Sequence, residues 1–182
     1  MFFMSGAVLA NTIFSTLTLI SQLAILAIWV SILLKKDGWL GLIKTHAILI
    51  AFGVALISTL GSLVYSEILG YVPCQLCWYQ RILMYPQVVM LGVALFLKGD
   101  KKITYINSLI LSFLGALLAG YHYLLQIGAT EASFCNFDEL GLGCSSSFGF
   151  NLGYITIPMM ALTGFLLIGA LQVLKLRENK KQ

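Results

Sequence analysis

The chain alternates between five long apolar stretches and short polar segments that carry nearly all of its charges. Each stretch is long enough to cross about 30 Å of hydrocarbon as a helix that rises 1.5 Å per residue. None of the stretches contains Lys or Asp, and Glu67 is their one Glu. We therefore predict an all-α membrane protein, a bundle of about five transmembrane helices. The stretches are Ala7–Leu34, His46–Leu69, Trp78–Leu97, Ile103–Gln126 and Leu152–Leu174.

The composition supports a protein that lies within a membrane. Hydrophobic residues make up 59% of the 182 residues and charged residues only 10%, and the mean hydropathy is +0.94. Too few charges remain to solvate a soluble globule of this size. The segments between the apolar stretches are also too short to hold a separate soluble domain, so a single bundle is expected.

The basic residues predict the orientation of the bundle. The net charge is +4, and every lysine lies in the segments 35–44, 98–102 or 175–181. Helices that alternate in direction bring these three segments to one side, which the positive-inside rule assigns to the cytoplasm. The N-terminus and both cysteine-bearing loops are then extracytoplasmic, and the C-terminus is cytoplasmic. The first stretch lacks a basic segment before it, so we expect a retained helix and not a cleaved signal peptide.

All four cysteines fall in the predicted extracytoplasmic loops or at their margins, where the compartment is oxidising. Cys74 and Cys77 form a C-x-x-C motif directly after Pro73, at the beginning of the third predicted helix. Free backbone N–H groups and the helix dipole at such a position favour a thiolate. Cys135 and Cys144 lie in the longer loop between the fourth and fifth stretches, with two glycines between them. Such a loop can close a disulfide or reach toward another protein.

Two other interpretations of the cysteines remain open at this point. The four cysteines can form two structural disulfides, for which three connectivities exist. Alternatively, the four sulfur atoms can hold a tetrahedral zinc ion. A C-x-x-C motif alone does not decide between these interpretations and a redox site.

Ionisable side chains inside two of the stretches favour the redox site. Arg81 follows Cys77 by four residues, so both share one helix face. His122 lies at a comparable depth on the fourth helix and offers a titratable imidazole. The alternatives are an arginine that extends to the lipid headgroups and an ordinary interfacial histidine. Gln80 and Gln87 are costly in lipid, so we expect them to face neighbouring helices.

Several of these features together resemble a known family. The motif "PCQLCWYQR" at residues 73–81 is followed by "MYP", then by "GYHY" on the next helix and by a two-cysteine outer loop. This pattern resembles the DsbB-type disulfide bond formation proteins of the bacterial cytoplasmic membrane, over about Thr45 to Gln182. The resemblance implies a thiol:quinone oxidoreductase. Such an enzyme re-oxidises a DsbA-like thioredoxin-fold dithiol oxidase and passes two electrons to membrane quinone, either ubiquinone or menaquinone.

The resemblance also implies roles for single residues. Cys74 and Cys77 correspond to the pair near the quinone, with Cys77 as the thiolate that contacts the ring. Arg81 corresponds to an arginine that positions the quinone. Cys135 corresponds to the cysteine that the partner protein attacks, and Cys144 to its resolving cysteine.

His122 corresponds by position to a histidine near the quinone. Two departures from the family pattern stand out. Residues 1–44 add a transmembrane helix and a basic cytoplasmic loop to the four-helix redox domain expected at residues 45–182, and the segment between the loop cysteines is short. A vitamin K epoxide reductase-like enzyme is the main alternative, although its loop cysteines precede the C-x-x-C motif. A structural or transport protein with inert disulfides is the other.

Overall fold

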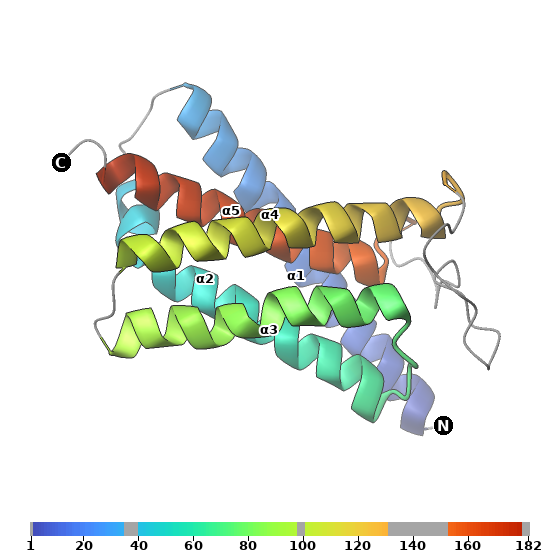
Figure 1. Ribbon diagram of the computed structural model, residues 1–182. Coiled ribbons are helices and arrows are strands. Elements are labelled where there is room, and N and C mark those ends of the chain that lie inside the picture. The colour runs from blue at the N-terminus through green and yellow to red at the C-terminus, as the bar shows by residue number, and fades with distance from the viewer. Residues whose placement is uncertain (1, 35–39, 98–100, 131–152, 180–182) are drawn as a thin grey trace.

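The computed structural model describes residues 2–34, 40–97, 101–130 and 153–179. These residues form helices and their connections, which confirms the predicted all-α bundle (Figure 1). Helix α2 continues into a single π-helical turn, labelled η1. The elements are α1 (Phe2–Leu33), α2 (Leu40–Leu63), η1 (Val64–Ile68), α3 (Gln75–Phe96), α4 (Lys101–Gln126) and α5 (Ile157–Asn179).

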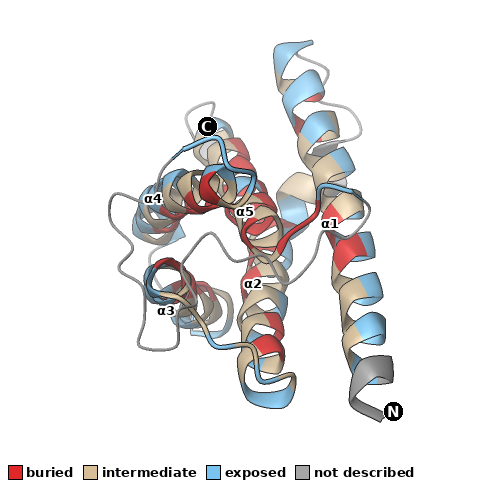
Figure 2. Cartoon of the chain, turned by 90° about the vertical axis from the view of Figure 1, so that its right-hand side faces the viewer, coloured by how far each residue is buried: buried red, intermediate tan, exposed pale blue. Residues whose placement is uncertain are grey.

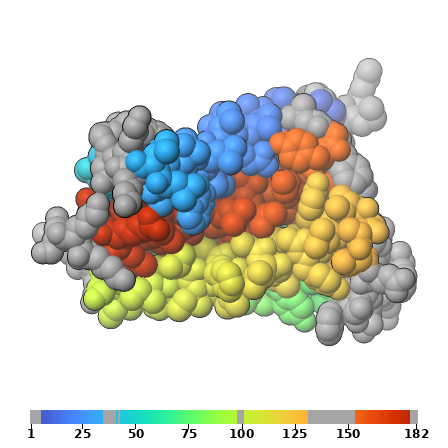
Figure 3. Space-filling view, turned by 90° about the horizontal axis from the view of Figure 1, so that it is seen from above, coloured from blue at the N-terminus to red at the C-terminus, as the bar shows by residue number. Residues whose placement is uncertain are grey.

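The helices run in alternating directions, and α5 is the central one. It packs against α4, α2 and α1, and more weakly against α3. Helix α1 lies on the side of the bundle away from α3 and α4 (Figure 2), and its surface lies along α5 in the space-filling view (Figure 3). The alternation brings η1 and the beginnings of α3 and α5 to the end of the bundle where α4 finishes (Figure 1). We call this the cysteine end, because α3 begins there with its C-x-x-C motif.

Four of the five helices in the described part of the chain are long and apolar enough to cross a membrane, and α3 is the exception. Helix α3 has 22 residues, a length that spans about 33 Å. Its lower hydropathy comes from polar residues, and three of these, Gln80, Arg81 and Gln87, are buried. These three polar side chains of α3 are therefore directed into the bundle, as expected for Gln80 and Gln87.

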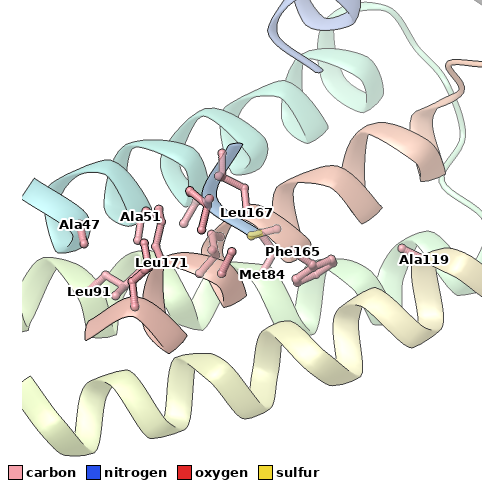
Figure 4. Close-up of a cluster of buried hydrophobic side chains, with 13 residues drawn as sticks. Ala47, Ala51, Met84, Leu91, Ala119, Phe165, Leu167 and Leu171 are labelled. Atoms are coloured by element: carbon pink, nitrogen blue, oxygen red, sulfur yellow. The ribbon is translucent and has the colours of Figure 1, made fainter. Parts of the chain in front are cut away.

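Small residues allow the helices to approach one another closely. Ala47, Ala51 and Ala55 follow one face of α2 and are fully buried. They form part of the apolar core with residues of α3 and α5 (Figure 4). Close approach through small residues is the usual way in which helices pack in a membrane, where lipid is as apolar as the helix surface.

A buried polar contact joins α3 to α4. Gln87 is fully buried, and its Oε1 accepts hydrogen bonds from Ser108 Oγ at 2.9 Å and Ser112 Oγ at 3.1 Å. Interhelical hydrogen bonds of this kind contribute about 0.6–2 kcal/mol each in a membrane protein. They fix the rotation of α3 against α4, and so help to position the first turn of α3.

The observed beginning of the last helix differs from the predicted one. The sequence predicted a span from Leu152, whereas α5 begins at Ile157 and continues to Asn179. The Thr156 side chain explains the later beginning, because its Oγ1 accepts a hydrogen bond from the backbone N–H of Met159 at 3.4 Å. This is the geometry of a helix N-cap. Pro158, in the first turn, is compatible with a helix beginning there.

Candidate redox site

The first turn of α3 presents the C-x-x-C motif at the cysteine end. Cys74 is the N-cap residue and has an extended backbone conformation, and Cys77 lies in the turn that follows. Both are free thiols, and their sulfur atoms lie 3.2 Å apart. A disulfide bond has a length of about 2.05 Å. The pair can therefore change between dithiol and disulfide with a small movement of the side chains.

His122 of α4 contacts this pair. Its Nε2 lies 3.6 Å from Cys74 Sγ, and its Nδ1 lies 3.0 Å from Gln80 Nε2. The Gln80 amide nitrogen can only donate a hydrogen bond, so Nδ1 accepts. A neutral imidazole then carries its proton on Nε2, which points that proton at Cys74. His122 and Gln80 are both buried, so this arrangement is held away from lipid and water.

The surroundings of Cys74 favour its ionised form. Cys74 precedes the first residue of α3 and therefore lies outside that helix. A hydrogen bond from the Cys77 thiol lowers the pKa of the Cys74 thiol, burial opposes this effect, and a hydrogen bond from His122 lowers the pKa further. A thiolate is both the nucleophile and the better leaving group in disulfide exchange.

Arg81 lies one helical turn after Cys77 and is buried, with 8% of its surface exposed. Its Nε donates to Ser62 Oγ at 2.9 Å, and its Nη2 donates to Ser62 O at 3.1 Å. The guanidinium also lies 5.1 Å from the centre of the Trp78 ring. No carboxylate in the described part of the chain pairs with it. The site therefore contains a buried positive charge that a bound group with electron-rich oxygen atoms can use.

Cys77 and Arg81 both line one cavity of about 260 Å³. Its walls come from α1, α2, η1, α3 and α5 and from the segment between η1 and α3. The cavity surface is mostly apolar, and eight hydroxyl-bearing side chains, Gln80 and Arg81 add polar groups. This composition is typical of a site for a small, largely apolar molecule.

The structure brings four of the predicted site residues together. Cys77 and Arg81 face the cavity, whereas Cys74 and His122 lie against each other and are not in its wall. Cys135 and Cys144 lie outside the described residues.

Two further residues, Gln80 and Ser62, belong to the site and were not predicted from the sequence. Gln80 contacts His122, and Ser62 binds Arg81. A buried glutamine directly before the arginine was the available signal for Gln80. Ser62 gave no signal, because its role depends on how α2 packs against α3.

The same thiols and imidazole are also the ligand types that bind zinc. The donor atoms of Cys74, Cys77 and His122 lie within 4.8 Å of one another. In a redox site these atoms would exchange protons and electrons. A structural zinc site would not need the adjacent cavity or its buried guanidinium. The cavity therefore favours the redox function over zinc binding.

Comparison with known proteins gave consistent matches. The family described as "Disulfide bond formation protein DsbB" matches residues 44–174. A "Probable disulfide formation protein" of Oceanobacillus iheyensis is 42% identical over 143 residues, which cover 75% of this chain and 93% of that protein. "Disulfide bond formation protein C" of Bacillus subtilis is 46% identical over 118 residues, which cover 63% of this chain and 81% of that protein. No solved structure gave a significant match.

Proposed function

The chain belongs to the DsbB family of disulfide bond formation proteins, and on that premise we propose that it couples thiol oxidation outside the cytoplasm to the reduction of a membrane quinone. It is a disulfide-forming oxidoreductase with several helices that can span a membrane. The proposed partner is a DsbA-like thioredoxin-fold dithiol oxidase. The proposed acceptor is ubiquinone or menaquinone, in the cytoplasmic membrane of a bacterium.

One observation carries this proposal: a redox thiol and a buried guanidinium line the same apolar cavity. Cys77 and Arg81 both belong to its wall. An isoprenoid quinone has an apolar body and two carbonyl oxygens, so the apolar lining suits the body and the guanidinium suits an oxygen. A bound quinone accepts two electrons and two protons and leaves as a quinol.

The residues of the chain then have distinct tasks. Cys77 presents its sulfur to the cavity, while Cys74 lies on the other side of the pair, against His122. Arg81, held by Ser62, supplies a fixed positive charge and N–H donors where negative charge develops on an oxygen. Because the cavity is largely apolar, that charge is screened less than it would be in water. His122 Nε2 holds or returns a proton at Cys74 Sγ.

The loop cysteines supply the exchange with the partner. In this proposal the reduced partner attacks Cys135 of a Cys135–Cys144 disulfide, so the partner loses two electrons and the loop becomes a dithiol. The loop dithiol then reduces a Cys74–Cys77 disulfide, through a mixed disulfide between Cys74 and Cys144. Each exchange breaks one disulfide and forms one, and the two electrons end on Cys74 and Cys77.

The quinone is needed for energetic reasons. A DsbA-type oxidase has a reduction potential of about −120 mV, ordinary protein oxidants have one of about −180 mV, and 30 mV corresponds to about 1.4 kcal/mol for two electrons. Oxidation of such a partner by thiol exchange alone is therefore unfavourable. Removal of electrons from Cys77 by a quinone offsets this cost.

The proposal is tested by mixing the purified protein with quinone and a reduced thioredoxin-fold dithiol oxidase while quinone absorbance is followed. We expect the absorbance to bleach with the intact protein and to stay constant with Cys77→Ser. Cys135→Ser should stop bleaching with the protein partner but retain it with dithiothreitol, which can reduce Cys74–Cys77 directly. An intact protein that oxidises the partner without quinone bleaching would contradict the proposed acceptor. A Cys135→Ser variant that oxidises the partner at the normal rate would contradict the relay.

A further inference from the structure

Helix α1 forms one wall of the cavity that contains Cys77 and Arg81. Four of its residues line the cavity, namely Phe14, Leu17, Thr18 and Ser21. The family match begins at residue 44, so α1 lies outside it. Helix α1 packs on α5 and α2 and has no contact with α3 among the described residues. It therefore faces Cys77 and Arg81 across the cavity.

Hydrogen bonds at two positions, Asn11 and Gln22, hold this part of α1 in place. Tyr65 of η1 donates a hydrogen bond to Asn11 Oδ1 at 2.8 Å, before the lining stretch. After it, Gln22 bonds to Thr163 of α5 at 3.3 Å and accepts a hydrogen bond from Tyr154 at 2.8 Å. The stretch 14–21 lies between these two anchors. Its position beside the cavity is thus fixed by specific side chains and not only by apolar packing.

The cavity lining reaches the molecular surface at exposed residues of α1 and α2, and also at Val72 near the cysteine end. Leu17 of α1 and Ile57 of α2 both line the cavity, and they are 38% and 47% exposed. Side chains that line a cavity and also reach the outer surface mark its opening. Both lie on helices that are long and apolar enough to cross a membrane. A molecule dissolved in the bilayer can therefore enter at this opening without passing through water.

We propose that α1 is part of the quinone site and binds the isoprenoid tail, which leaves the cavity between α1 and α2 while the ring lies toward Cys77 and Arg81. This inference rests on the proposed function. Thr18 is the informative residue, because it is buried and lines the cavity. Its hydroxyl donates to the Phe14 carbonyl of its own helix. A larger apolar side chain at this position removes no hydrogen bond to another helix and fills space that the tail would occupy.

The test compares Thr18→Leu with a matched control, Thr16→Leu. Thr16 is exposed on α1, donates to the Thr12 carbonyl in the same way, and is not part of the cavity wall. For Thr18→Leu we expect the KM for ubiquinone-2, which carries two isoprene units, to rise about fivefold or more. Overpacking a binding site typically weakens binding by at least this factor. The KM for tail-less ubiquinone-0 should change less than about twofold. Thr16→Leu should leave both values within about twofold of the intact protein.

A Thr18→Leu variant that keeps the normal KM for ubiquinone-2 would overturn the proposal. An intact protein that reduces neither these ubiquinones nor the matching menaquinones would instead overturn the proposed function, so the two failures are distinguishable. If Thr18→Leu does not fold, photocrosslinking decides. A benzoylphenylalanine in place of Leu17 should form an adduct with ubiquinone-2 by mass spectrometry, and one in place of Ile20, which is exposed and not part of the cavity wall, should not. Equal labelling at both positions, or none at Leu17, would contradict a tail site on α1.

Discussion

Replacing His122 with Phe should make the Cys74 thiol less acidic. His122 Nε2 lies 3.6 Å from Cys74 Sγ. A hydrogen bond to a charged group contributes about 1.5–3 kcal/mol, and the long N···S distance favours the lower end of that range. Since one pKa unit corresponds to 1.36 kcal/mol, we expect the substitution to raise the pKa of Cys74 by about one unit. At a pH below the original pKa of Cys74, the fraction of Cys74 present as thiolate is then about tenfold lower in His122→Phe than in the intact protein.

The rate of alkylation by iodoacetamide as a function of pH measures this effect, with mass spectrometry to separate Cys74 from Cys77. The loop cysteines are replaced with serine, so that only this pair reacts. His46→Phe is the matched control, because His46 is exposed near the beginning of α2, at the opposite end of the bundle. The midpoint for Cys74 should move to higher pH in His122→Phe and stay unchanged in His46→Phe. An unchanged midpoint in His122→Phe would show that the imidazole does not stabilise the thiolate.

Two further substitutions test the quinone pocket and the packing of the bundle. Arg81→Gln should lower kcat/KM for quinone about a hundredfold, as removal of a donor that stabilises developing charge usually does. Arg81→Lys should have an intermediate kcat/KM. Normal quinone kinetics in Arg81→Gln would contradict the proposed role of Arg81. Gly115→Ala should destabilise the protein by about 1–3 kcal/mol, because an added Cβ would lie close to the buried Phe165 ring. Gly120→Ala, whose Cβ would meet no atom within 4 Å, is the control, and equal resistance to heating in detergent would refute the packing argument.

Much of the fold could be predicted from the sequence because membrane insertion imposes a simple rule. A helix must satisfy its own backbone hydrogen bonds in lipid, so long apolar stretches have few alternatives. The beginning of α5 was predicted too early, since hydropathy counts apolar residues and does not detect the cap that Thr156 provides. The π-helical turn η1 was also not predicted. It has no separate hydropathy signal, because Val64–Ile68 continues the apolar stretch of α2.

The candidate site could be predicted where it depends on one helix and not where it depends on two. The spacing of Cys77 and Arg81 places them on one face of α3, and both line the cavity. The contacts of His122 with Cys74 and Gln80 depend on the rotation of α4 against α3, which hydropathy does not specify. The contribution of α1 to the cavity likewise depends on how α1 is placed against α2 and α5.

The most direct test of the account is a single-turnover reaction without any partner protein. The reduced protein, with Cys135 and Cys144 replaced by serine, is mixed with quinone in the absence of oxygen while absorbance and free thiols are measured. We predict that one quinone is reduced per protein molecule and that Cys74 and Cys77 together lose two thiols by forming a disulfide. Thiols that stay reduced beside an unchanged quinone absorbance would contradict direct electron transfer from this pair.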